Sequence, residues 1–148
     1  MALVLSVSCS KNNPNDPTKT KEQMLQQKWQ DNDTTWGISQ YIITDSTFDS
    51  LYNDSVSYSF SISEIVWNSD NKSGIIYGKY TANSSSQEVV GKYYAVSFKD
   101  LTDTTVKISG AYKSGGVSAT DKLEDAKTTF TEADGYFGAY SDCTAVAQ

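Results

Sequence analysis

Apolar and polar residues alternate along most of this chain after residue 28, as they do in a β-strand with one buried face. The clearest case is residues 55–63, where Val56, Tyr58, Phe60 and Ile62 alternate with serines. A strand with this sequence places its aliphatic and aromatic side chains on one face and hydroxyl groups on the other. The segment therefore predicts a strand that covers a hydrophobic core on one side only.

Further segments of the chain have strand-like patterns. They are residues 36–44, 47–52, 64–67, 74–82, 89–99, 104–113 and 135–140. Short stretches rich in Asn, Asp, Ser and Gly separate them, and these residue types favour turns. Short strands with short polar connections predict an antiparallel meander.

One segment near the C-terminus predicts a helix instead. Ser118 and Asp121 have the spacing of a capping box, with Asp in place of the usual Glu. The apolar residues that follow on one helical face are Ala119, Leu123, Ala126 and Phe130. We expect a helix of about three turns that packs on the sheet through Leu123 and Phe130.

These elements predict a mainly β fold with about eight antiparallel strands and one C-terminal amphipathic helix alongside. Two architectures satisfy the pattern, a closed up-and-down barrel and a two-sheet sandwich. The short sequential connections favour the barrel. The tripeptide Gly-Lys-Tyr occurs at residues 78–80 and again at 91–93, and a glycine inside a strand is typical of a bulge or bend. A chance match of three residues is the alternative.

The N-terminal residues predict a lipid anchor. Residues 1–9, MALVLSVSC, resemble the end of a truncated lipoprotein signal, with Cys9 as the acylated residue. Residues 10–27 follow as a flexible tether that holds both prolines, although residues 21–28 have helix-forming composition. Residues 28–143 form the predicted barrel domain and residues 144–148 a frayed tail. The alternative is an unprocessed N-terminus with an incidental cysteine.

Charge and composition exclude several kinds of chemistry. The net charge of −6 disfavours nucleic acid, whose phosphates need clustered Lys and Arg. The chain has no histidine, which removes Ser–His and Cys–His catalysis and His-ligated metals. We therefore expect no catalytic residue, no metal and no cofactor. If Cys9 carries a lipid, Cys143 is a free and buried thiol; the alternative is a Cys9–Cys143 disulfide.

Aromatic residues are the positive signal, with ten Tyr, five Phe and three Trp in the chain. Tyr and Trp combine an apolar ring with a polar group, which suits a pocket for an amphipathic ligand. The candidate inward-facing ligand residues are Trp36, Tyr58, Phe60, Trp67, Tyr80 and Tyr94, with Phe98 as the alternative to Tyr94. The competing interpretation is that these side chains only fill the core.

The sequence also resembles a known type of protein. Four segments carry the resemblance: GISQYIITDSTFDSLY, SGIIYGKYT, VGKYYAVSFKDLTDTTVKISGAY and LEDAKTTFTEADGYFGAYSDC. They are similar to segments of small spirochaete-type bacterial surface lipoproteins with a lipocalin-like barrel. The resemblance implies a barrel and display on the cell surface.

Together these observations predict a non-enzymatic barrel, lipid-anchored to a membrane of the bacterial cell envelope, at the surface or in the periplasm. We expect it to bind a small hydrophobic or amphipathic ligand. The alternative is a solid barrel that acts as an adhesion or structural scaffold through contacts between its loops and a protein partner.

Overall fold

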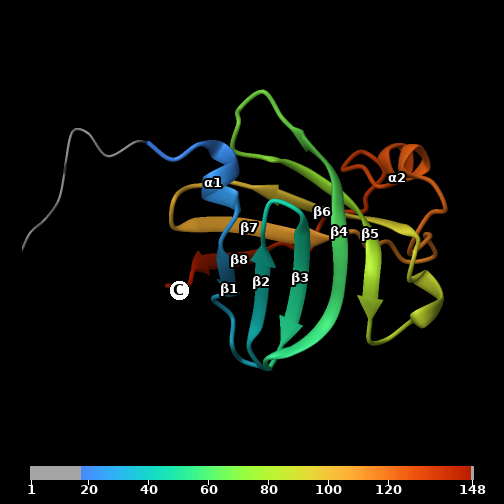
Figure 1. Ribbon diagram of the computed structural model, residues 1–148, viewed down its shortest axis with the longest axis horizontal. Helices are drawn as coiled ribbons and strands as arrows, with labels where there is room; N and C mark the ends of the chain where they lie inside the picture. Colours follow the sequence, from blue (N-terminus) through green and yellow to red (C-terminus); the bar gives the residue numbers. More distant parts are fainter. Residues whose placement is uncertain (1–17, 148) are drawn as a thin grey trace, which may run out of the picture.

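Eight antiparallel strands pair in sequence order and close into a barrel (Figure 1). The structure, a computed structural model, describes residues 18–147. The strands are β1 (Lys28–Asp31), β2 (Ser39–Ile43), β3 (Thr47–Tyr52), β4 (Ser55–Trp67), β5 (Gly74–Asn83), β6 (Tyr93–Lys99), β7 (Thr105–Gly110) and β8 (Ser141–Ala145). Since β8 pairs with both β7 and β1, no strand edge remains open. The predicted up-and-down barrel is confirmed and the sandwich is excluded.

Strand β4 joins two segments that the sequence pattern separated, residues 55–63 and 64–67. Its pairing with β5 shifts register twice, between Ser59 and Phe60 and between Ile62 and Glu64. Such shifts bend a strand and increase its twist. Figure 1 shows β4 as a long curved strand, so one element follows the barrel wall through the change in direction.

The first and last strands differ most from the prediction. β1 was not expected as a separate strand, and residues 135–140, expected to be extended, lie outside any strand. β8 begins at Ser141 and continues to Ala145, which the sequence placed in a frayed tail. Ala145 pairs with Trp29, and the Val146 amide donates to the Lys28 carbonyl at 2.8 Å. Pairing between the two ends of the chain orders both strands.

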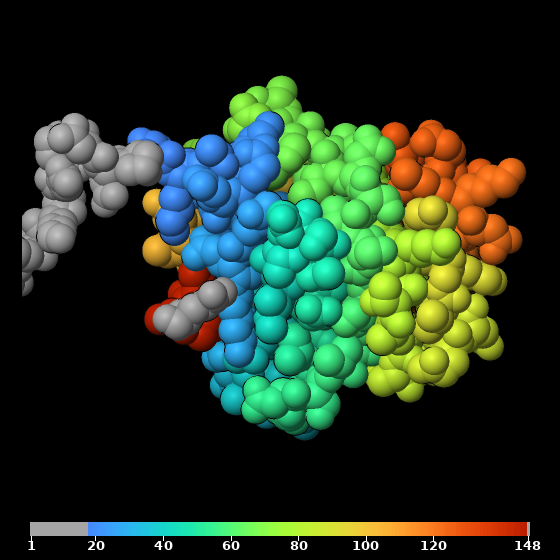
Figure 2. Space-filling model, viewed as in Figure 1, coloured from blue at the N-terminus to red at the C-terminus, as the bar shows by residue number. Residues whose placement is uncertain are grey.

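Helix α1 (Lys21–Leu25) occupies part of the predicted tether, residues 10–27. Thr20 and Gln23 form a reciprocal capping box, which satisfies two backbone N–H groups at the helix start. Leu25 is buried, and the Trp29 indole N–H donates to the Leu25 carbonyl at 3.0 Å. In Figure 2 this blue segment packs directly on the barrel strands. The folded body therefore begins before residue 28; residues 10–17 lie outside the described residues.

The strand directions define two ends of the barrel. The α1 end carries helix α1 and three connections, residues 44–46, 68–73 and 100–104. The loop end carries the other four connections, residues 32–38, 53–54, 84–92 and 111–140. Backbone hydrogen bonds link neighbouring turns at the α1 end, for example Leu101 N to Lys72 O at 3.0 Å. The longer segments, which can form a site, gather at the loop end.

Helix α2 (Leu123–Thr129) is shorter than predicted and starts later. The N-cap is Lys122, which makes no side-chain cap hydrogen bond, so the capping box predicted at Ser118 and Asp121 is wrong. Thr120 instead forms a β-bridge with Tyr93, which keeps the chain extended up to that residue. Tertiary pairing thus overrides the local capping pattern.

The helix covers the outer face of β5 and β6. The Tyr77 hydroxyl donates to the Phe130 carbonyl at 3.2 Å, and Lys127 pairs with Glu64 of β4 at 2.9 Å. Ala126 and Phe130 are buried, as the helical periodicity predicted. A second helical turn, η1 (Gln87–Val89), lies between β5 and β6.

Gly78 confirms the bulge predicted for a glycine in a strand, whereas Gly91 does not. Gly78 pairs with Ile62 at a register shift, but Gly91 lies in a turn with φ +87°. A Cβ atom at Gly78 would overlap the Phe60 ring and the Ser61 carbonyl oxygen. Only glycine therefore lets this ring lie flat against the neighbouring strand.

We expect Gly78→Ala to lower the free energy of unfolding by about 1–3 kcal/mol, because the ring and strand β4 must move apart. Urea denaturation measures the change. Gly138→Ala is the matched control, since a Cβ atom there meets nothing within 4 Å. That variant is expected to change the stability by less than about 1 kcal/mol. Equal effects of the two substitutions would contradict the argument.

Candidate functional site

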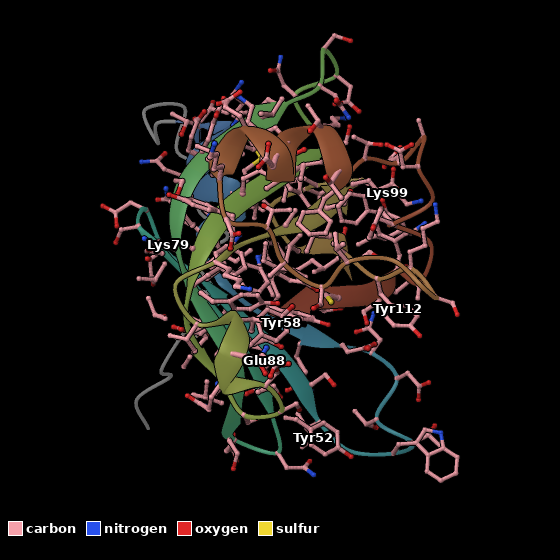
Figure 3. All side chains as sticks on the ribbon, turned by 90° about the vertical axis from the view of Figure 1, so that its right-hand side faces the viewer. Tyr52, Tyr58, Lys79, Glu88, Lys99 and Tyr112 are labelled. Atoms are coloured by element: carbon pink, nitrogen blue, oxygen red, sulfur yellow. The ribbon has the colours of Figure 1, made fainter. Side chains whose placement is uncertain are left out.

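Four of the predicted ligand residues form one aromatic cluster inside the barrel. Tyr58 lies 6.0 Å from Tyr80 and 5.6 Å from Tyr94, centroid to centroid, in edge-to-face contacts. Phe60 lies 6.3 Å from Tyr94, and Tyr80 stacks on Tyr94 at 4.8 Å. Figure 3 shows Tyr58 near the middle of the molecule. The four rings fill this part of the barrel interior.

Strand register brings these rings together. Phe60 of β4 pairs with Tyr80 of β5, and Gly78 of β5 pairs with Tyr94 of β6. Gly110, at the end of β7, makes room for the hydroxyl groups: a Cβ atom there would lie 2.7 Å from the Tyr94 oxygen. The cluster depends on residues from four different strands.

The inner tyrosines are neutral hydrogen-bonding groups. Burial raises the pKa of Tyr58, Tyr80 and Tyr94 well above the ordinary value for a phenol. The Tyr94 hydroxyl donates to the Ala111 carbonyl at 3.1 Å. These phenols therefore stay protonated around neutral pH and present apolar ring faces with polar tips.

A pocket of about 260 Å³ lies at the loop end against this cluster. Tyr80 and Tyr94 belong to both, so the pocket adjoins the tyrosine-rich interior. The remaining lining residues come from the chain that follows β7: Ala111, Tyr112, Lys113, Gly116, Val117 and Ser118. We call residues 111–118 the pocket wall.

Tyr136 holds the pocket wall in place. Its carbonyl accepts from the Tyr112 amide at 2.8 Å, and its hydroxyl accepts from the Val117 amide at 3.1 Å. Gly116 packs so closely on this hydroxyl that a Cβ atom would lie 2.6 Å from it. Tyr136 is itself buried and contacts Phe130 with ring centroids 5.1 Å apart. The wall is thus fixed by the backbone and the side chain of one residue about 20 positions further along the chain.

A second depression at the loop end has a different character. Its volume is about 600 Å³, and it is lined by Asp31, Asn32, Asp33, Ala139, Tyr140, Ser141 and Asp142. It is open, and most of the side chains that line it are polar or acidic. Within residues 18–147, no group of three or more His, Cys, Asp or Glu side chains is arranged to hold a metal ion.

The two predicted tryptophans are not part of the pocket. Trp36 lies in the β1–β2 connection and is 87% exposed, so the prediction that it faces inward is wrong. Trp67 lies toward the α1 end of β4, in edge-to-face contact with Phe98 at 4.9 Å and with the Lys21 ammonium 4.7 Å from its ring centroid. The alternative candidate Phe98 is fully buried there.

The sequence pattern missed most of the pocket wall. Residues 111–113 were assigned to a strand, but β7 ends at Gly110. Ser118 was predicted to cap the start of the helix. The adjacent Gly115 and Gly116 were the available signal, because paired glycines indicate a turn at which a new segment begins.

Cys143 is a buried, free cysteine, and Cys9 lies outside the described residues. Burial, with Asp31 and Asp142 nearby, raises the pKa of the Cys143 thiol to about 12. A thiol that stays protonated is a poor nucleophile. Cys143 therefore serves as an apolar core residue.

The fold and the pocket together define this protein as an eight-stranded antiparallel barrel with a tyrosine-lined cavity at one end. Comparisons with protein-family models, curated proteins and solved structures give no match. Across residues 18–147, no helix combines the length and apolar character that crossing a membrane requires.

Proposed function

We propose that this protein binds a small amphipathic molecule in the pocket at the loop end and acts without catalysing a reaction. We further propose that a lipid on Cys9 anchors it to a membrane of a bacterial cell envelope. The observation that supports binding best is the cavity of about 260 Å³ that adjoins the buried tyrosines.

The size and lining of the pocket indicate the size of its ligand. Pockets for drug-sized molecules range from about 300 to 1,000 Å³, so a cavity of about 260 Å³ suits a smaller molecule, such as one ring system with a short chain. Tyr80 and Tyr94 offer ring faces, and Val117 and Ala111 add aliphatic surface. Tyr112 and Ser118 provide polar groups near the opening.

The described chain begins at the end of the barrel opposite the pocket. The described chain enters at helix α1, whereas the pocket lies at the loop end. A lipid on Cys9 would then leave the pocket facing away from the membrane. Intact-mass analysis of protein extracted from membranes tests this part: a diacyl modification on Cys9 supports it, and an unmodified cysteine overturns it.

The binding proposal is tested with 2-naphthol, a fluorescent probe with one apolar ring system and one hydroxyl group. We expect saturable binding to the purified protein, followed by the change in naphthol fluorescence. Val117→Trp should weaken binding at least tenfold, because the larger side chain occupies the pocket. NMR shift changes should map to the lining residues.

Val56→Trp is the matched control for this experiment. Val56 is 48% exposed and Val117 52% exposed, but Val56 lies on β4 outside the pocket lining. The control should bind 2-naphthol as the wild-type protein does. Absence of saturable binding, or equal weakening by both substitutions, would refute the proposal.

The solid-scaffold alternative rests on one observation, an exposed tryptophan on a loop whose backbone is held by hydrogen bonds. The Trp36 carbonyl accepts from the Tyr52 hydroxyl, and Ile38 and Asn53 exchange two hydrogen bonds of 2.8 and 2.9 Å. A rigidly presented Trp is a common anchor of protein interfaces. If this is the function, Trp36→Ala should abolish retention of the protein on isolated envelope fractions, and retention unchanged by the substitution would exclude it.

A further inference from the structure

We propose that the pocket selects small aromatic monocarboxylates, with the carboxylate bound by Lys113 and the ring against Tyr80 and Tyr94. This inference rests on the function proposed above and adds the chemical class of the ligand. It follows from the charges around the pocket, from the position of the Lys113 ammonium and from the arrangement of the Tyr80 and Tyr94 rings.

Lys113 is the one charged residue that lines the pocket. Within residues 18–147, the ion pairs of 4.0 Å or less involve Lys92, Lys107 and Lys127, and none involves Lys113. Its ammonium group therefore has no carboxylate partner in the described part of the chain. An ammonium donates three hydrogen bonds and accepts none, so its natural partner is an anion.

The surroundings strengthen the argument for an anion. The protein carries a net charge of −6, and the other depression at the loop end is lined by residues that include Asp31, Asp33 and Asp142. An anionic ligand is repelled from that acidic lining and attracted to the pocket with the unpaired lysine. The two depressions at this end thus differ in the sign of the charge that they accept.

The cation and the apolar floor lie on different parts of the lining. Tyr80 and Tyr94 form the floor as stacked rings 4.8 Å apart, tilted by 25°. Lys113 belongs to the pocket wall, and its ammonium lies 5.7 Å from the centroid of the Tyr136 ring that supports this wall. A ligand that satisfies both needs an apolar ring at one end and a negative charge at the other. In a cavity of about 260 Å³, that describes a single aromatic ring system with a short carboxylate arm.

The test compares 1-naphthylacetate with 1-naphthylacetamide, which has the same ring and arm but no charge. The wild-type protein should bind the acetate at least tenfold more tightly than the acetamide. Lys113→Met should remove this difference by weakening acetate binding alone, and Lys113→Arg should restore most of it. Raising the salt concentration from 0.05 to 0.5 M should weaken acetate binding only.

Lys79 offers a closely matched control. Its ammonium also lies over a tyrosine ring, 5.8 Å from the Tyr93 centroid, but it belongs to β5 and does not line the pocket. Figure 3 shows Lys79 and Tyr112 of the pocket wall on different sides of the molecule. Lys79→Met should preserve the preference for the acetate.

The outcomes separate this inference from the function on which it rests. Equal binding of acetate and acetamide by the wild-type protein overturns the ligand class and leaves binding at the loop end intact. An equal loss of the preference for the acetate in Lys113→Met and Lys79→Met also overturns it, because the preference would then depend on the net charge of the whole protein. Failure of both naphthyl ligands and of 2-naphthol overturns the class together with the proposed function.

Discussion

Replacing Phe60 with alanine is expected to lower the free energy of unfolding by about 3–5 kcal/mol, a large part of the stability of a domain this size. Phe60 is 1% exposed and stacks on Phe48 with ring centroids 4.8 Å apart and an interplanar angle of 3°. Its other neighbours include Tyr58, Tyr94 and the bare backbone of Gly78. The ring is therefore surrounded by aromatic and backbone atoms on several sides.

The loss is large because the surroundings cannot close the gap. Each strand in the barrel is hydrogen-bonded on both sides, which holds the wall in place when a ring is removed from the centre. Urea denaturation gives the change directly, and the melting temperature should fall by about 10–20 °C. Val56→Ala, on the same strand but 48% exposed, should change the stability by less than about 1 kcal/mol. A loss below about 1 kcal/mol for Phe60→Ala would show that the interior is not packed as described.

The second large effect is expected at alkaline pH, where the folded protein should lose stability steeply. Burial raises the pKa of Tyr58, Tyr80 and Tyr94, whereas tyrosines in the unfolded chain ionise near 10. Above that pH the unfolded chain has released protons that the folded protein still holds. The free energy of unfolding therefore falls as pH rises, by about 1.4 kcal/mol per pH unit for each such tyrosine.

Between pH 8 and pH 11, the three inner tyrosines together should remove about 4 kcal/mol. Cys143, whose pKa burial raises to about 12, acts in the same direction from a lower starting pH because its unfolded value is near 9. Urea denaturation at intervals of half a pH unit measures the slope. The absorbance of tyrosinate, followed in parallel, should rise for these residues only as the protein unfolds.

One substitution at the centre of the cluster isolates the contribution of a single residue. Tyr58→Phe should reduce the alkaline slope by about 1.4 kcal/mol per pH unit, whatever it does to stability at pH 7. Tyr112→Phe, on a side chain that is 77% exposed, should leave the slope unchanged. If both substitutions gave the wild-type slope, ionisation of the inner tyrosines would not drive alkaline unfolding.

The sequence predicted the strands whose burial pattern is local. In residues 55–63 the alternation of apolar residues with serines predicted a strand, and the structure confirms it. Val56, predicted on the core-facing side, is 48% exposed because the pairing with β3 shifts register between Tyr58 and Val56. β1 and β8 were misplaced because each has only four or five residues and is ordered by pairing with the other end of the chain. A short stretch of sequence does not include both strands, so it cannot reveal that they pair.

Local sequence patterns also gave wrong predictions where a contact with a distant segment outweighed the local preference. The capping pattern at Ser118 predicted a helix start, but the bridge between Thr120 and Tyr93 keeps the chain extended up to Thr120, and the helix begins only after Lys122. Trp36 was expected inside because a strand was predicted to begin there and because a Trp side chain suits a pocket for an amphipathic ligand. Its place in a connection at the loop end leaves it exposed instead.

The residue types alone predicted only some of the residues that line the candidate site. Tyr80 and Tyr94 were expected to face inward, and they form the pocket floor. Lys113 and Val117 were not identified, because their position in the pocket lining depends on Tyr136, which holds the pocket wall from beyond helix α2. A lone lysine in the sequence gives no sign that it borders a cavity.

The amino-acid sequence by itself determined the β class of this protein, the alternation that separates inner from outer faces, and the aromatic character of the interior. These properties follow from each residue and its near neighbours. The tertiary structure decided the closure of the barrel through β1 and β8, the late start of α2, and the placing of Lys113 beside the inner tyrosines. Those features arise from contacts between segments far apart in the chain, whose free energy outweighs the local preferences.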